Sequence, residues 1–181
     1  MLPVTGALPS EGDGGSADLI QCSEPVEFGL MRRGEASKVS AMIVRAFHED
    51  VAPDCDVQGV EAFERYAHPK ALLKRSEHGH LVLVARVQAS IVGAIELREH
   101  QHISLLFVDR QHRRRGLARE LLSRALSMGR SGGHHVVEVT VNSSPYAVPA
   151  YEKLGFRATG PAQTKSGIRF APMVLTLDNE R

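Results

Sequence analysis

The feature that most constrains the fold is a pair of β-branched runs separated by only two residues. "HLVLVARV" at His80–Val87 and "SIVGAIELR" at Ser90–Arg98 are typical of buried strands, and the short Gln88–Ala89 junction between them favours a hairpin. A third apolar run, "HISLLFV" at His102–Val108, follows directly. The middle of the chain is therefore predicted to hold three successive strands, of which the first two form a hairpin.

The segments around these strands alternate between helical and strand patterns. Apolar residues at helical spacing predict helices over 35–51, 60–66, 69–76, about 114–128 and 146–154. In the fourth of these helices the stripe predicted to be buried comprises Leu117, Leu121, Leu122, Ala125 and Met128. Further strands are predicted at 26–32, at 136–142, in "FRATG" and in "IRFAPMVLTL". This order of elements indicates a mixed α/β (α+β) layer protein without a second domain.

The composition is that of an ordinary globular domain and excludes several classes of protein. The chain has 181 residues, of which 43% are hydrophobic and 24% charged. Its net charge of +1 gives no overall field that would recruit nucleic acid or an anionic membrane, and neither is expected as a partner. No apolar run approaches the roughly 18 residues of a membrane span. Two cysteines, Cys22 and Cys55, are expected to be reduced thiols in a cytoplasmic protein.

Two further expectations concern the start of the chain and its histidines. Gly, Ser, Pro and acidic residues up to Pro25 are typical of a disordered leader, so residues 1–25 are assigned to a leader and 26–181 to the folded domain. The histidines lack the i, i+4 spacing of a zinc-binding helix, and no cysteine pair supports them. No metal site is therefore expected.

The stretch "RQHRRRGLARELL" at 110–122 concentrates cations where a helix is predicted to start. Arginines are unfavourable beside the positive end of a helix dipole, by about 0.3–1 kcal/mol each, so an ordinary solvated helix end is disfavoured. The free N–H groups of a helix start favour an anion, most often a phosphate, and Gly116 lets the backbone approach such a ligand. Nucleic acid is the weaker alternative, because no aromatic residues interleave with the arginines.

Two motifs give the chain a resemblance to the GNAT superfamily of N-acetyltransferases. "RRRGLA" at 113–118 is similar to the Q/R-x-x-G-x-G/A signature of that family, and "ISLLFVDRQH" before it looks like the fourth strand. "AYEKLGF" at 150–156 resembles the tyrosine-containing helix before the sixth strand. The resemblance covers about 26–177. It implies a mixed central sheet of about seven strands, flanked by about four helices and splayed between strands 4 and 5.

The same resemblance implies that the chain binds acetyl-CoA. The diphosphate would lie on the signature turn, the pantetheine arm would enter between strands 4 and 5, and backbone N–H groups near Leu106 would stabilise the oxyanion. Relatives often carry an Asn seven residues before the tyrosine, where this chain has Ser144, with Asn142 nine residues before it. The residues that the resemblance assigns to acetyl-CoA are Leu106, Phe107, Val108, Arg113, Arg114, Arg115, Gly116, Leu117, Ala118, Asn142 and Ser144.

Acetylation of an amine needs an acid for the leaving thiolate and a base for the attacking amine. The resemblance assigns the acid to Tyr151, although a buried aromatic with a bonded hydroxyl would look the same. His102 lies six residues before Val108, where several relatives carry a Glu or His, and is the first candidate for the base. Glu96 is the second candidate. Either residue could instead simply face solvent.

The resemblance predicts an N-acetyltransferase that moves the acetyl group of acetyl-CoA to a primary amine by direct attack in a ternary complex. The alternatives are a catalytically inactive acyl-CoA-binding module and a nucleic-acid binder that uses Arg110 and residues 113–115. The acceptor is not identified, whether small molecule or protein amine, and a homodimer is compatible with the family. Substrate walls are expected at 47–66 and 160–170. The acidic residues of "HEDVAPDCD" could attract a cationic amine or only solubilise a loop: Glu49, Asp50, Asp54 and Asp56.

Overall fold

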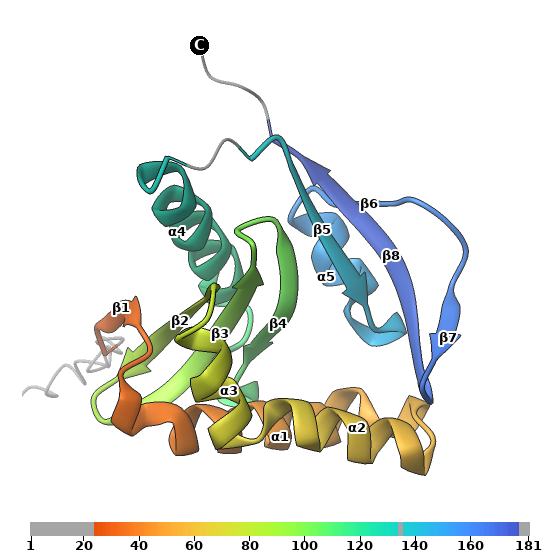
Figure 1. The fold of residues 1–181 in the computed structure, drawn as a ribbon, viewed down its shortest axis with the longest axis horizontal. Helices are drawn as coiled ribbons and strands as arrows, with labels where there is room; N and C mark the ends of the chain where they lie inside the picture. Colours follow the sequence, from red (N-terminus) through yellow and green to blue (C-terminus); the bar gives the residue numbers. More distant parts are fainter. Residues whose placement is uncertain (1–23, 134–135, 178–181) are drawn as a thin grey trace, which may run out of the picture.

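The computed structural model describes residues 24–133 and 136–177, which form one mixed sheet flanked by helices (Figure 1). The helices are α1 Ala36–Asp50, α2 Val57–Ala67, α3 Pro69–Ser76, α4 Leu117–Ser131 and α5 Val148–Lys153. The strands are β1 Val26–Leu30, β2 His80–Val87, β3 Ser90–Arg98, β4 His102–Val108, β5 Glu138–Ser143, β6 Arg157–Ala158, β7 Gln163–Lys165 and β8 Ile168–Thr176. Of the predicted leader, only Glu24 and Pro25 lie within the described residues, and Cys22 lies outside them.

The sheet has the order β1-β2-β3-β4-β5-β8-β6, and β7 pairs with β8 in a hairpin. All pairs are antiparallel except β4 and β5, which are parallel. The predicted fold class is confirmed, with eight strands in place of about seven because of the short β7, and five α-helices in place of about four. The short sequence of β7 is polar and has no alternation of apolar residues, so no strand could be predicted there.

Strands β4 and β5 diverge after a short paired region, which confirms the predicted splay (Figure 1). Within the described residues they pair only at His102–Thr140 and Ile103–Val141. On the other side of β4, the register with β3 shifts between Glu96 and Leu97, so Ser104 is an extra residue, a β-bulge. The bulge coincides with the point of divergence. Beyond it, the main chain of β4 has no strand partner on the β5 side.

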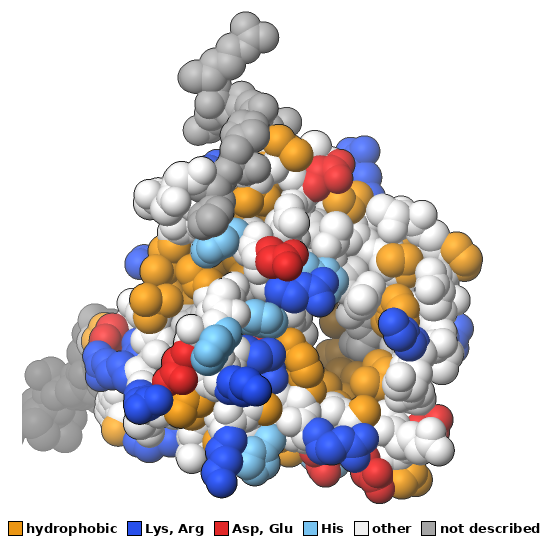
Figure 2. Space-filling view, viewed as in Figure 1, with side chains coloured by type: hydrophobic (Ala, Val, Ile, Leu, Met, Phe, Trp, Pro, Cys, Tyr) orange, Lys and Arg blue, Asp and Glu red, His pale blue; other side chains and the backbone are white. Residues whose placement is uncertain are grey.

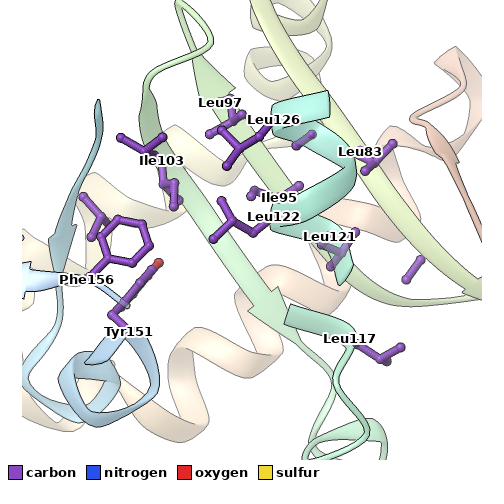
Figure 3. Close-up of a cluster of buried hydrophobic side chains, with 14 of the residues drawn as sticks. Leu83, Ile95, Leu97, Ile103, Leu117, Leu121, Leu122, Leu126, Tyr151 and Phe156 are labelled. Carbon is purple, nitrogen blue, oxygen red and sulfur yellow. The ribbon is translucent and has the colours of Figure 1, made fainter. Parts of the chain in front are cut away.

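Two hydrophobic clusters cover the two faces of the sheet. The first lies between the sheet and α4, and includes Leu121 and Leu122 with Ile95, Ile103 and Tyr151 (Figure 3). The second lies on the opposite face and packs α1 and α3 on the sheet through Val39, Met42, Ile43, Leu72, Val82, Val84 and Leu105. The strands β2 and β3 are therefore buried on both faces, as their unbroken apolar sequences require.

Helix α4 differs from its prediction at both ends. It begins at Leu117 rather than near 114, because Arg114 and Gly116 have left-handed φ angles of 60° and 78° and cannot continue a helix. At the other end, Met128 was predicted to be buried but is 37% exposed. It keeps the spacing of the stripe, yet it lies in the last helical turns, where it lines an open groove beside β2 with Leu30 and His80.

Candidate active site

The turn between β4 and α4 presents a row of free backbone donors. The N–H groups from Arg114 to Arg119 have no acceptor among the described residues, and the first bond of the helix runs from Glu120 N to Gly116 O at 3.0 Å. Arg114 and Gly116 both have left-handed φ angles, a backbone conformation that recurs in anion-binding nests of successive N–H groups. The positive end of the α4 dipole adds to this. The turn is therefore built to receive an anion.

The side chain of Arg113 points away from this row of donors. Its Nη1 donates to Asp50 Oδ1 at 3.1 Å and to the Tyr146 hydroxyl at 3.2 Å, and its Nε donates to the Val108 carbonyl at 3.1 Å. Asp50 ends α1, and Tyr146 lies in the 3-10 turn Pro145–Ala147 after β5. Arg113 thus ties three segments together around the splay. Arg114 and Arg115 are exposed at the turn, so they are the arginines left to contribute charge there.

Tyr151 lies on the α4 side of the splay, where it is 7% exposed. Its ring packs edge-on against Phe156, with the ring centres 5.2 Å apart. Its hydroxyl is directed away from α5 toward β4 and Leu122 (Figure 3) and makes no hydrogen bond with the described residues. Burial raises the pKa of this phenol well above its usual value near 10. The group therefore stays protonated and can donate a proton over the whole physiological range.

His102 lies on the opposite face of β4 from Ile103. Its Nδ1 is 2.8 Å from Thr140 Oγ1, across the first of the two paired positions of β4 and β5. Burial, and then the nearby positive charge of Arg98, lower the pKa of the imidazole below 6.5. The ring is therefore neutral at pH 7 and able to accept a proton.

The suggestion that Glu96 could simply face solvent is wrong. Its side chain is 1% exposed, and Arg75 of α3 donates to both carboxylate oxygens, from Nε at 2.6 Å and from Nη2 at 3.0 Å. The Nδ1 of His80 approaches the same carboxylate at 2.7 Å. These partners occupy the carboxylate. Its geometry suits a buried structural anion better than a base that must collect a proton.

Tyr66 is a residue of this region that the sequence did not single out. The guanidinium of Arg75 lies 3.6 Å from the centre of the Tyr66 ring and donates to the Tyr66 carbonyl at 2.8 Å. The Tyr66 hydroxyl lies beside Ser104, the bulge residue of β4, and burial is the main cause that raises its pKa. Glu96 and Arg75 thus hold an aromatic hydroxyl at the start of the splay. A lone tyrosine at the end of a helix carries no local signal for this role.

The two polar candidates after β5 lie in different positions. Asn142 is exposed on the face of β5 that also carries Thr140. Ser144 precedes the 3-10 turn as its N-cap residue, although its side chain makes no capping bond. Of the strand residues assigned to acetyl-CoA, Leu106 and Val108 lie on the α4 side, and Phe107 lies on the other side against Phe63.

Two kinds of feature are absent from the described residues. No helix in the described part of the chain is long and apolar enough to cross a membrane. Residues 24–133 and 136–177 also contain no group of three or more His, Cys, Asp or Glu side chains placed to hold a metal ion. His134 and His135 lie outside those ranges.

A mixed sheet that splays between two parallel strands, with a turn of free N–H groups after the first of them, is the architecture of one class of acyltransferases. Residues 51–177 match the family model described as "Acetyltransferase (GNAT) domain". The chain belongs to the GNAT acetyltransferase family.

Relatives of known name support the assignment. The chain is 32% identical over 126 residues to the uncharacterized N-acetyltransferase YafP of Escherichia coli (strain K12). This match covers 68% of the chain and 76% of YafP. It is 33% identical over 95 residues to human N-acetyltransferase 8, a match that covers 47% of this chain and 42% of the human protein. The chain thus spans less than half the length of that human relative.

Solved structures share the fold. A GCN5-related N-acetyltransferase from Rhodopseudomonas palustris has a TM-score of 0.70 at 21% identity, over 83% of this chain and 95% of that chain. The PaiA N-acetyltransferase of Thermoplasma acidophilum, solved in complex with coenzyme A, has a TM-score of 0.70 at 16% identity, over 84% and 99%.

Proposed function

We propose that this protein transfers the acetyl group of acetyl-CoA to a primary amine. The observation that carries the proposal is the row of unbonded N–H groups from Arg114 to Arg119 beside the splay of β4 and β5. A diphosphate satisfies such a row, and a splayed strand pair offers a slot for an extended arm. Among the proteins of this fold, PaiA was solved with coenzyme A and yncA of Salmonella typhimurium with acetyl-CoA, which supports the same ligand here.

The reaction we propose is direct attack of the amine on the thioester carbon. The C–N bond forms, the carbonyl oxygen becomes an oxyanion, and the C–S bond then breaks to release the thiolate. N–H groups of β4 near Leu106, in the part without a strand partner on the β5 side, would hold the oxyanion. Tyr151 would give its proton to the thiolate, since its hydroxyl is directed toward β4 and has no bonded partner among the described residues.

For the base we propose His102, acting directly or through a water. Its neutral imidazole lies on the face of the sheet opposite Tyr151, so the two proton transfers would take place on opposite sides of the splay. This separates the acid from the base and prevents a direct proton exchange between them. Glu96 is not proposed for this step, because Arg75 and His80 occupy its carboxylate.

A Gly116→Asp substitution tests whether the diphosphate binds at the turn between β4 and α4. Gly116 has open space around its Cβ position, so the new side chain causes no collision, but its carboxylate would lie among the donors of the turn. Repulsion at about 4 Å costs on the order of 1–4 kcal/mol in this setting. We therefore expect acetyl-CoA to bind roughly 10- to 100-fold more weakly by calorimetry.

Gly133→Asp is the matched control for this substitution. Gly133 also has a left-handed φ, 83°, and open space at its Cβ, but it lies at the other end of α4. Both variants carry the same strain and the same added charge. Equal affinities of the two variants for acetyl-CoA would contradict the proposed diphosphate site. In a separate assay, binding to nucleic acid with a steep salt dependence would favour the alternative of a nucleic-acid binder.

The proposed base also predicts the pH dependence of the reaction. Because the pKa of His102 lies below 6.5, kcat/KM should be constant through neutral pH and should fall about tenfold per pH unit once the ring is protonated. Protonation of this partly buried ring also opposes folding as the pH falls, so circular dichroism must show that the protein is still folded. His102→Gln should lose the acidic limb, whereas Thr140→Val should keep it. A limb that persists in His102→Gln would show that another group is the base.

A further inference from the structure

The side of the splay that faces α2 is a cleft with two largely apolar walls. Residues 168, 170, 172 and 174 of β8 point to the opposite face from Met173 and Leu175, which are in the α4-side core. They share this face with Thr140 and Asn142, their neighbours on β5. In Figure 1, α5 lies behind β5 and β8, and no helix is drawn in front of these strands. This first wall therefore presents Ile168, Phe170, Pro172 and Val174, all partly exposed.

The second wall is aromatic and comes from α2 and β4. Phe63 stacks on Phe47 with the ring centres 3.8 Å apart and meets Phe107 edge-on at 5.7 Å. Phe63, Phe107 and Tyr66 are only partly buried. Figure 2 shows a hollow between the two halves of the molecule, with hydrophobic side chains in its depth.

The two walls meet at one end through a contact between glycines. A Cβ on Gly59 of α2 would lie 2.4 Å from the carbonyl oxygen of Gly167, and the N–H of Asp56 donates to that oxygen at 3.2 Å. Gly59 and Phe63 are one helical turn apart, so the face of α2 that touches the β7–β8 turn continues along Phe63. The cleft is thereby closed at the hairpin turn and has a fixed width there.

Three of the four acidic residues that could have attracted a polycation, Glu49, Asp50 and Asp56, already have partners. Asp50 forms the ion pair with Arg113, and Glu49 lies 3.9 Å from the same guanidinium. The Asp56 carboxylate accepts the Gly59 N–H at 2.8 Å. Among the described residues of 49–56, only Asp54 has no partner for its carboxylate. Glu138 is on the same face of β5 as Thr140. It precedes the two residues of β5 that pair with β4, so it lies away from the splay.

We infer that the acceptor is a small primary amine with an aromatic or branched apolar body, rather than a polyamine or an aminoglycoside. Rings and methyl groups of such a body would be removed from water against the aromatic and β8 walls, which is favourable in proportion to the area buried. A second ammonium group would have to give up water between two largely apolar walls, which is costly for a charged group. This inference rests on the proposed function, because it concerns the acceptor of that reaction.

The test compares amines and one pair of variants. Thiol release from acetyl-CoA is measured with 2-phenylethylamine and isopentylamine against spermine and kanamycin, and we expect kcat/KM to be at least tenfold higher for the first pair. Phe170→Ala should raise KM for 2-phenylethylamine about tenfold and leave acetyl-CoA affinity unchanged. Arg169→Ala, next to it on the other face of β8, should change neither value.

Each outcome separates the inference from the function on which it rests. A preference for spermine or kanamycin, or no reaction with either apolar amine although acetyl-CoA binds, overturns the inference alone. Failure to bind acetyl-CoA in calorimetry overturns the proposed function. If Phe170→Ala does not fold, Phe170→Leu is used, and a KM unchanged in a folded variant also counts against the inference.

Discussion

Replacing Tyr151 with phenylalanine should reduce kcat by about two to four orders of magnitude, because the substitution removes only the proton donor. The ring itself is retained, so its edge-on contact with Phe156 and its place in the α4-side cluster should survive. The lost hydroxyl has no hydrogen bond to the described residues, and its removal leaves no partner unsatisfied. We therefore expect an unchanged free energy of unfolding and unchanged affinity for acetyl-CoA, with thiol release as the activity that is lost.

Tyr146→Phe is the control for this experiment. Tyr146 belongs to the same segment after β5, but it is 55% exposed and its hydroxyl accepts a bond from Arg113. Its substitution should change kcat by less than about tenfold. If Tyr151→Phe keeps the turnover of the unmodified protein, Tyr151 is not the acid. If the unmodified protein binds acetyl-CoA without turnover on any amine, the inactive binding module becomes the better interpretation.

The parts of this fold that were predicted correctly depend on residues close together in the chain. The hairpin of β2 and β3 follows from two apolar runs and a two-residue junction, and the stripe of α4 follows from helical spacing. The position of the turn after β4 follows from the arginine–glycine motif. These features need no knowledge of tertiary contacts, because local periodicity and turn chemistry determine them.

The parts that could not be predicted depend on partners far apart in the chain. Arg113 and Asp50 are 63 residues apart, and their pairing turns a cation of the signature motif into a tie between α1 and the turn. Removing Arg113 would therefore leave a carboxylate without its partner as well as change the turn. For that reason the proposed diphosphate site is better tested at Gly116, where an added Cβ has no neighbour within 4 Å.

Glu96 shows the same limit in a strand. A charged residue within a strand is usually a sign of a solvent face, and nothing near Glu96 in the sequence indicates its partners. Burial of β3 on both faces, however, places every residue from Ile91 to Leu97 out of contact with water. The carboxylate is tolerated there because Arg75 is 21 residues away in the chain but directly beside it in the fold.

This buried pair should make Glu96 one of the least replaceable residues of the domain. Glu96→Ala would leave the Arg75 guanidinium buried without its anion, since the Arg75 side chain is only 17% exposed. Removing one partner of a buried pair costs about 3–5 kcal/mol, a large part of the 5–15 kcal/mol that stabilises a typical domain. Urea unfolding should therefore show a midpoint far below that of the unmodified protein.

Two comparisons separate the buried pair from a general effect of lost charge. Glu77→Ala removes a carboxylate from the surface pair with Arg33, whose side chains are 41% and 76% exposed, and should cost less than about 1 kcal/mol. Arg75→Met combined with Glu96→Leu replaces both charges with apolar groups and should be more stable than Glu96→Ala alone. In the double variant no guanidinium holds the ring of Tyr66 beside Ser104. A Glu96→Ala protein as stable as Glu77→Ala would mean that water reaches Arg75 and that the pair contributes little to the stability of the domain.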